Sequence, residues 1–216
     1  MPMWLMHQRR LYFAMISPMT SDDQLLPDSL PSLPPYPGIP FHAISLVRTV
    51  AEAQLAYEAM IKADVLGFDT ESKPIFFKGQ SSDGPHLIQL ATDTQAFLFP
   101  VAHATNVDAV KAVLEANHIL KVGFGLSDDN KRLHAKLGIT TTNVLDLSRA
   151  MRESRHREMG AKAAVAKFFG MKLQKSKKTS TSNWAVAALS ERQMQYAADD
   201  AQVALLTYRQ WLLLKA

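Results

Sequence analysis

Short apolar segments alternate with longer segments of helical periodicity from about residue 45 onward. Two of the apolar segments, 86–91 and 96–99, are separated only by a few polar residues, a spacing that predicts an antiparallel hairpin. Later apolar segments are separated by helical ones, which is typical of parallel strands joined by helices. The pattern therefore predicts an α/β fold with a mixed sheet covered by helices. The predicted strands are 65–69, 86–91, 96–99, 119–124 and 144–147, and the predicted helices include 49–63, 106–117 and 128–137.

The first 44 residues differ from this pattern. Seven prolines stand between residues 17 and 40, and proline neither continues a helix nor supplies the amide that a central strand needs. We therefore expect 1–44 to be an extended arm or linker and 45–216 to be the folded domain. The apolar stretch after Arg9-Arg10 is shorter than the core of an export signal, and no apolar run is long enough for a membrane span. We expect a cytoplasmic protein with no membrane partner.

Cysteine is absent from the 216 residues, which excludes a disulfide scaffold, thiolate catalysis and metal sites held by cysteine. The charge is unevenly distributed: the segment 151–180 holds nine basic and two acidic residues, although the whole chain has a net charge of only +4. A basic segment beside an acidic remainder favours a polyanionic partner. An ordinary solvated surface would have the same composition.

Asp69 and Glu71 stand at the end of the apolar segment 65–69. Because side chains alternate along a strand, both would project from one face. Two carboxylates on an inner face are costly unless a positive group neutralises them, and Mg²⁺ prefers such hard oxygen ligands. The alternative is that both side chains lie in a solvated turn that leads to Ser72-Lys73-Pro74.

Near the C-terminus, Ser190 is followed three residues later by glutamine, a capping box that predicts a helix over about 191–213. On this helix Tyr196 and Asp200 are four residues apart and share one face. Asp199, three residues after Tyr196, is the competing acid, and spacing alone does not exclude it.

A glycine-containing connection, 123–126, leads from a predicted strand into a helix that begins on Ser127 or Asp128. An aspartate at this point often caps the helix or is stabilised by its dipole, which suits Asp128 especially. One helix start cannot use both acids as caps. Asp129 is therefore available for another role.

These motifs occur together and in order, and they resemble those of the DEDD superfamily of 3′-5′ exonucleases, in its tyrosine-containing (DEDDy) branch of ribonuclease D and Werner syndrome exonuclease domains. Three motifs at plausible spacing are far more specific than any one of them. The resemblance covers about residues 45–214. The segments that carry it are 67–72, 87–91, 121–133 and 182–201.

The resemblance implies a ribonuclease H-like α/β fold, with a mixed central sheet flanked by helices. It also implies a metal-dependent 3′-5′ exonuclease that hydrolyses terminal phosphodiesters of DNA or RNA and releases 5′-mononucleotides. The implied cofactors are two divalent cations, Mg²⁺ or Mn²⁺, and the implied partner is the 3′ end of a nucleic acid strand. Basic residues in a loop of the segment 151–180 would contact the backbone phosphates: Lys175, Lys177 and Lys178.

Residue by residue, the resemblance also implies the site. Tyr196 matches the tyrosine that positions the attacking water, and the match selects Asp200 over Asp199 and Asp129 over Asp128. The motifs contain no basic partner for the acids, so the site is expected to need metal for its stability. The four residues that match the metal-binding acids are Asp69, Glu71, Asp129 and Asp200.

Two other classes of protein are compatible with parts of this pattern. A catalytically silent nucleic-acid-binding module with the same fold would be expected to have lost one of the acids, and none is missing. An endonuclease or integrase-type nuclease predicts a different order of acids and no Tyr-x-x-x-Asp motif. These residues do not distinguish DNA from RNA as the substrate.

Overall fold

The computed structural model describes residues 33–75, 83–103, 107–152 and 158–215. Within them, a six-stranded sheet has the strand order β1-β4-β3-β2-β5-β6. The central pairs β2–β3 and β3–β4 are antiparallel, and the pairs β1–β4, β2–β5 and β5–β6 are parallel. The predicted hairpin and the mixed sheet are confirmed. The strands are β1 (Ile44–Leu46), β2 (Val65–Glu71), β3 (Leu87–Ala91), β4 (Ala96–Pro100), β5 (Leu120–Gly123) and β6 (Val144–Asp146).

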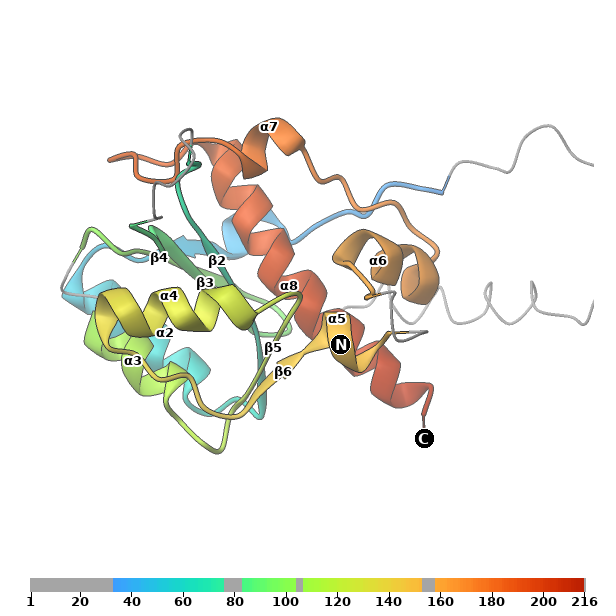
Figure 1. Cartoon of the computed structure of the whole chain (residues 1–216), viewed down its shortest axis with the longest axis horizontal. Helices are drawn as coiled ribbons and strands as arrows, with labels where there is room; N and C mark the ends of the chain where they lie inside the picture. The colour runs from blue at the N-terminus through green and yellow to red at the C-terminus, as the bar shows by residue number, and fades with distance from the viewer. Residues whose placement is uncertain (1–32, 76–82, 104–106, 153–157, 216) are drawn as a thin grey trace, which may run out of the picture.

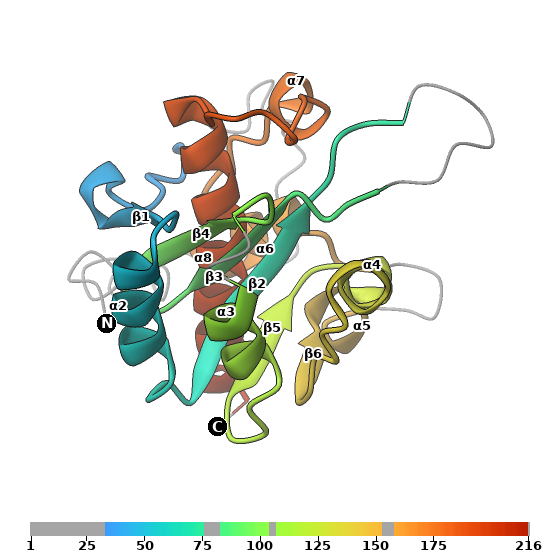
Figure 2. The ribbon, with the colours of Figure 1, turned by 90° about the vertical axis from the view of Figure 1, so that its left-hand side faces the viewer.

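Helices cover both faces of this sheet (Figures 1 and 2). Helices α2, α3 and α4 lie on one face, and the long helix α8 crosses the other. None of the described helices is both long and apolar enough to cross a membrane. The helices are η1 (Phe41–Ala43), α2 (Val50–Met60), α3 (Val107–Leu114), α4 (Ser127–Leu137), α5 (Leu147–Ala150), α6 (Ala161–Phe169), α7 (Lys177–Ser180) and α8 (Glu191–Leu213).

Side chains alternate along β2, so its two faces have different surroundings. Leu66 and Phe68 are fully buried in the core under α2, α3 and α4. On the other face, Gly67 lies against α8, and a Cβ at this glycine would overlap the backbone carbonyl of Ala201. The absence of a side chain at Gly67 therefore permits the close approach of α8 to the sheet.

Helix α8 begins as the sequence predicts. The Ser190 hydroxyl accepts a hydrogen bond from the backbone of Gln193, whose side chain in turn binds the Ser190 amide, so the capping box is confirmed. The face of α8 that packs on the sheet carries three buried small residues, Ala197, Ala198 and Ala201. Small side chains here let the helix backbone lie close to the strands.

Residues 33–44, which the sequence assigns to the extended arm, pack against the domain. Tyr36 and Ile39 are buried, and the backbone of Tyr36 donates a hydrogen bond to Lys172, 2.9 Å away. The folded unit therefore includes the last part of this proline-rich segment, whose described residues have no helix before η1 at Phe41–Ala43.

The segment around Lys175 differs from expectation. The sequence predicts a loop, but Lys177–Ser180 form the short helix α7, and this part of the prediction is wrong. The Ser176 hydroxyl caps the helix by accepting a hydrogen bond from the Thr179 amide, and Thr179 itself is buried. A serine cap and one buried side chain are sufficient to order a segment whose composition suggested a loop.

We expect Gly67→Ala to destabilise the protein by about 1–3 kcal/mol, because the added methyl group must push α8 away from β2. Chemical denaturation of the variant and of the unchanged protein measures this difference. Gly160→Ala is the matched control, since a Cβ at Gly160 meets nothing within 4 Å. Equal losses in the two variants would contradict the steric explanation.

Candidate active site

The end of β2 and the middle of α8 bring carboxylates together. Strand β2 extends to Glu71, so Asp69 and Glu71 lie on the strand and not in a solvated turn. Both project from the face on which Gly67 contacts α8. Asp200 is buried on α8, and Asp129 lies in the first turn of α4. We call these four residues the acid cluster.

Each carboxylate of the acid cluster resists ionisation. Burial, followed by the charges of Asp129 and Asp200, raises the pKa of Asp69 well above its usual range. Burial and the neighbouring charges of Asp69 and Asp200 raise the pKa of Glu71 to about 9. Burial is also the largest cause of the raised pKa values of Asp129 and Asp200. The structure thus brings the four predicted acids close enough to act on one another.

Lys175 lies inside the acid cluster, where the sequence predicted no basic partner. Its Nζ donates to Oδ2 of Asp200 at 2.8 Å, and the two side chains are 27% and 4% exposed. Burial opposes the charged form of Lys175, but attraction by Asp200 and other carboxylates leaves the pKa of its ammonium raised. Lys175 lies outside the motif segments, so the motifs alone gave no sign of this cation. One lysine supplies a single positive charge against four carboxylates.

Tyr196 borders the same cluster. Its ring centroid lies 5.6 Å from Nζ of Lys175 and 6.0 Å from the ring centroid of Trp184. Burial, then the charges of Asp200 and Glu71, raise the pKa of the Tyr196 phenol. The phenol therefore stays protonated at neutral pH and is able to donate a hydrogen bond.

Asp199 faces away from the acid cluster. Its Oδ1 accepts hydrogen bonds from the backbone amide of Ile39 at 2.8 Å and from Nε2 of Gln195 at 2.9 Å. Gly38, with φ of +72°, passes so close that a Cβ there would lie 2.7 Å from the same oxygen. Asp199 is thus half-buried and is held by neutral amides.

Asp128 and Asp129 have different surroundings at the start of α4. The helix begins at Ser127 without a side-chain cap, and Asp128 is exposed, with Oδ1 3.1 Å from Nζ of Lys131. Of the two roles expected for Asp128, capping is therefore wrong, whereas its place in the first turn of α4 is one where the helix dipole favours a carboxylate. Asp129 instead accepts a hydrogen bond from the hydroxyl of Thr70, on β2. This contact ties the start of α4 to the end of β2.

Gln89 is a polar residue that the sequence analysis did not single out. It pairs with Asp69 across β2 and β3, and directly opposed residues of such a pair share one face. Its side chain is fully buried, and neither its Nε2 nor its Oε1 has a hydrogen-bond partner. The available signal was a glutamine in an otherwise apolar strand. No comparable signal distinguished Lys175 from its basic neighbours.

The donor set fits divalent cations in its chemistry. Among the described residues, no group of three or more His, Asp or Glu side chains is already arranged as a metal site. The carboxylates are nevertheless hard oxygen ligands of the kind that Mg²⁺ prefers. The unpartnered amide of Gln89 opposite Asp69 indicates that a further polar group, such as water or an ion, belongs beside the cluster. The contact with Lys175 uses Oδ2 of Asp200 and the contact with Thr70 uses Oδ1 of Asp129, so each contact engages one oxygen of its carboxylate.

The remaining two lysines singled out in the sequence lie on α7. Lys177 and Lys178 are exposed, and neither joins the acid cluster. Lys175 therefore has different surroundings from Lys177 and Lys178, although it is only two residues from Lys177 in the sequence. Contact of these side chains with phosphates stays a prediction.

We expect Asp199→Asn to stabilise the protein relative to the unchanged chain as pH rises. Burial raises the pKa of Asp199 to about 6, above its value in the unfolded chain. As pH rises, the unfolded chain therefore ionises first, and the folded protein loses stability until the pH has passed the folded pKa of about 6. Asparagine cannot ionise, and its carbonyl oxygen accepts the same hydrogen bonds. Chemical denaturation at about pH 4 and about pH 8 measures the free energy of unfolding of both proteins. The variant should gain about 1–3 kcal/mol over the unchanged protein between the lower and the higher pH. Asp128→Asn, at an exposed position, is the control and should show little pH-dependent gain.

Known proteins resemble this chain in sequence. Residues 44–212 match the family model described as 3′-5′ exonuclease. The sequence is 28% identical over 149 residues to the mouse (Mus musculus) bifunctional 3′-5′ exonuclease/ATP-dependent helicase WRN, which covers 68% of this chain and 11% of that protein. The chain spans about half or less of the length of the curated relatives it matches.

Solved structures show the same fold. The Nibbler EXO domain of Aedes aegypti has a TM-score of 0.68 at 24% identity, with 82% of this chain and 92% of that one covered. Trypanosoma brucei RNase D in complex with RNA U12 has a TM-score of 0.67 at 21% identity, with coverage of 77% and 61%. The α/β fold predicted from the sequence, with a mixed sheet flanked by helices, is therefore confirmed.

Proposed function

The chain belongs to the 3′-5′ exonuclease family, and on that premise we propose that the acid cluster is its catalytic centre. The reaction is hydrolysis of the terminal phosphodiester at the 3′ end of DNA or RNA, with release of 5′-mononucleotides. The observation that carries the proposal is the convergence of four carboxylates, one buried and three half-buried, beside a neutral tyrosine at the end of β2. Burial of so many acids lowers stability, and binding of a divalent metal accounts for their retention.

The carboxylates of Asp69, Glu71, Asp129 and Asp200 would hold two divalent cations, Mg²⁺ or Mn²⁺. Such ions, when bound, activate water and stabilise negative charge on the leaving oxygen. The protein contributes ligands on three different elements, β2, α4 and α8. Their position on packed strands and helices, and not on loops, keeps the ligands oriented for the reaction.

Tyr196 would orient the attacking water towards phosphorus. Its phenol is protonated, so it can donate one hydrogen bond and accept another. Packing against Trp184 limits the rotation of the ring. A fixed phenol beside the acid cluster positions water without altering the charge of the site.

Lys175 would stabilise the acid cluster whenever it lacks cations. Its ammonium binds Asp200 directly, and without it this buried carboxylate would have no positive neighbour as close. The exposed Lys177 and Lys178 on α7 are then the candidates for contact with backbone phosphates.

We expect Lys175→Met to lower the melting temperature in EDTA, because removal of one partner leaves a buried charge uncompensated. Mn²⁺ should then raise the melting temperature more in this variant than in the unchanged protein, since the ion replaces the lost charge and binds only the folded state. Calorimetry with and without Mn²⁺ measures both effects. Lys177→Met, an exposed neighbour, should behave like the unchanged protein. An equal metal response in all three proteins would rule out this role.

Catalysis is tested with end-labelled single-stranded DNA and RNA in Mg²⁺, Mn²⁺ or EDTA. Activity should proceed from the 3′ end and stop in EDTA. Under single-turnover conditions, Asp200→Asn should lose at least ~10³-fold in rate, as expected for a direct metal ligand. Tyr196→Phe should lose less, because it removes only water orientation.

Asp199→Asn is the matched control in this series, since Asp199 faces Ile39 and not the acid cluster. Its rate should fall by less than ~10-fold. An active Asp200→Asn beside an inactive Asp199→Asn would overturn the assignment of the catalytic acid. Full activity in excess EDTA would overturn metal dependence.

A further inference from the structure

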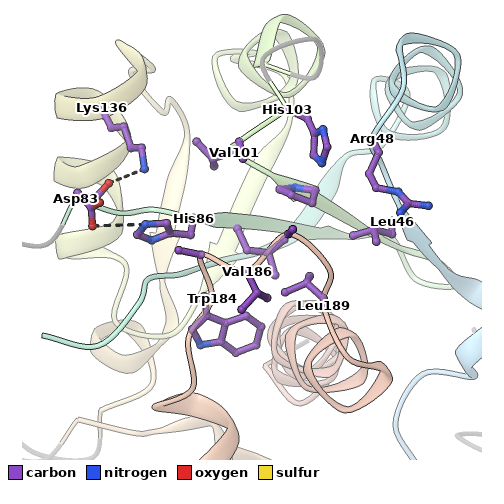
Figure 3. Close-up of a pocket in the computed structure, with 15 residues that line it drawn as sticks. Leu46, Arg48, Asp83, His86, Val101, His103, Lys136, Trp184, Val186 and Leu189 are labelled. Atoms are coloured by element: carbon purple, nitrogen blue, oxygen red, sulfur yellow. Dashed lines mark hydrogen bonds and ion pairs between the residues drawn. The ribbon is translucent and has the colours of Figure 1, made fainter.

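A pocket of about 470 Å³ lies outside the acid cluster, at the ends of β1 and β4 and the start of β3 (Figure 3). We call it the β4-end pocket. Part of its wall is apolar, formed by Leu46, Val101, Val186 and Leu189. Val186 is 38% exposed although it is hydrophobic. The volume lies within the range of pockets that hold small organic ligands.

The β4-end pocket shares walls with the proposed catalytic centre. Leu87 lines the pocket and pairs with Glu71 across β2 and β3. The backbone amide of His86, another lining residue, donates to the carbonyl of Glu71 at 2.8 Å. Trp184 lines the pocket and packs against Tyr196. A ligand in this pocket would therefore lie next to the residues proposed for catalysis.

The charged groups of the β4-end pocket favour an anion. Its acid, Asp83, already binds Nζ of Lys73 at 2.8 Å. Lys136 donates to the backbone carbonyl of Asp83 (Figure 3) and to that of Pro85. Among the described residues it forms no ion pair with a carboxylate.

Two further groups on the rim are available to a ligand. Among the described residues, the side chains of Arg48 and His103 have no hydrogen-bond or ion-pair partner. The Glu52 carboxylate is nevertheless near Arg48: its pKa is lowered by the backbone amides of Arg48 and Thr49 and also by the Arg48 charge. Figure 3 shows both on the same side of the pocket, over the apolar residues. A guanidinium with free donors next to an apolar wall suits a phosphate attached to a flat, largely apolar group.

We propose that the β4-end pocket binds a nucleotide, with its phosphate at Arg48 and His103 and its base against Val101, Val186 and Leu189. The choice of ligand rests on the proposed function, because a 3′-5′ exonuclease produces nucleotides beside this pocket. The nucleotide is a released nucleoside monophosphate, because the phosphate of a strand's terminal residue is the one that is cleaved and would have to lie at the acid cluster.

Isothermal titration in EDTA tests the proposal without turnover. The probes are adenosine 5′-monophosphate, adenosine, inorganic phosphate and a short single-stranded oligoadenylate. We expect the monophosphate to bind more tightly than adenosine or phosphate alone, since it uses both parts of the pocket. The monophosphate should also bind more tightly than the oligonucleotide, and tighter binding of the oligonucleotide would overturn the assignment of the released product as the ligand.

Variants locate the binding. Arg48→Ala should weaken binding by about 10-fold or more, as loss of a charge-assisted hydrogen bond does, and Val186→Glu should weaken it further by placing a negative charge in the pocket. Arg192→Ala, at an exposed arginine of α8 outside the pocket, is the matched control and should bind normally. Asp69→Asn should also bind normally, because the acid cluster is not the site.

The proposal is overturned if no probe binds, or if Asp69→Asn abolishes binding while Arg48→Ala and Val186→Glu do not. That second result would place the nucleotide in the acid cluster and leave the proposed function intact. Failure of the proposed function is seen separately, as exonuclease activity that persists in Asp200→Asn, and it does not alter the titration.

Discussion

The close packing of α8 on β2 determines where the rest of the acid cluster lies. Gly67 has no side chain, and the carbonyl of Ala201 occupies the space that one would fill. At this separation Asp200 reaches the carboxylates of β2, one helical turn after Tyr196. At the other end of α8, Arg209 forms paired hydrogen bonds with Asp64, at 2.6 and 2.7 Å, which hold the helix across the sheet. A steric constraint in the core thus sets the geometry of the polar site.

The acid cluster has an electrostatic cost that the rest of the fold must offset. Carboxylates removed from water favour their neutral forms, and the raised pKa values of Asp69, Glu71 and Asp200 express this cost. Lys175 reduces the repulsion by one charge only. The large apolar core under α2, α3 and α4 supplies stability on the opposite face of the sheet. Stability and reactivity are therefore divided between the two faces of β2.

Two adjacent acids on α8 show how helix phase separates functions. Asp200 points to the β2 carboxylates and Lys175, whereas Asp199 receives hydrogen bonds from Ile39 and Gln195. Successive residues differ by about 100° around a helix, so neighbours cannot face the same surface. Asp199 thereby ties the N-terminal segment to α8, and this segment becomes part of the folded unit.

Local patterns were sufficient to predict five of the six strands, the hairpin, the capped helix α8 and the shared face of Tyr196 and Asp200, because each depends on residues close together in the chain, whereas β1 was not predicted. The motifs also identified the acids that the fold brings together. The environment of Lys175, the unpartnered amide of Gln89 and the attachment of Asp199 to Ile39 were not predictable in this way. Each depends on contacts between residues far apart in sequence. The sequence by itself therefore determined which elements form and which carboxylates they carry, whereas only tertiary packing decided which charges meet, since burial and distance in space control their interaction.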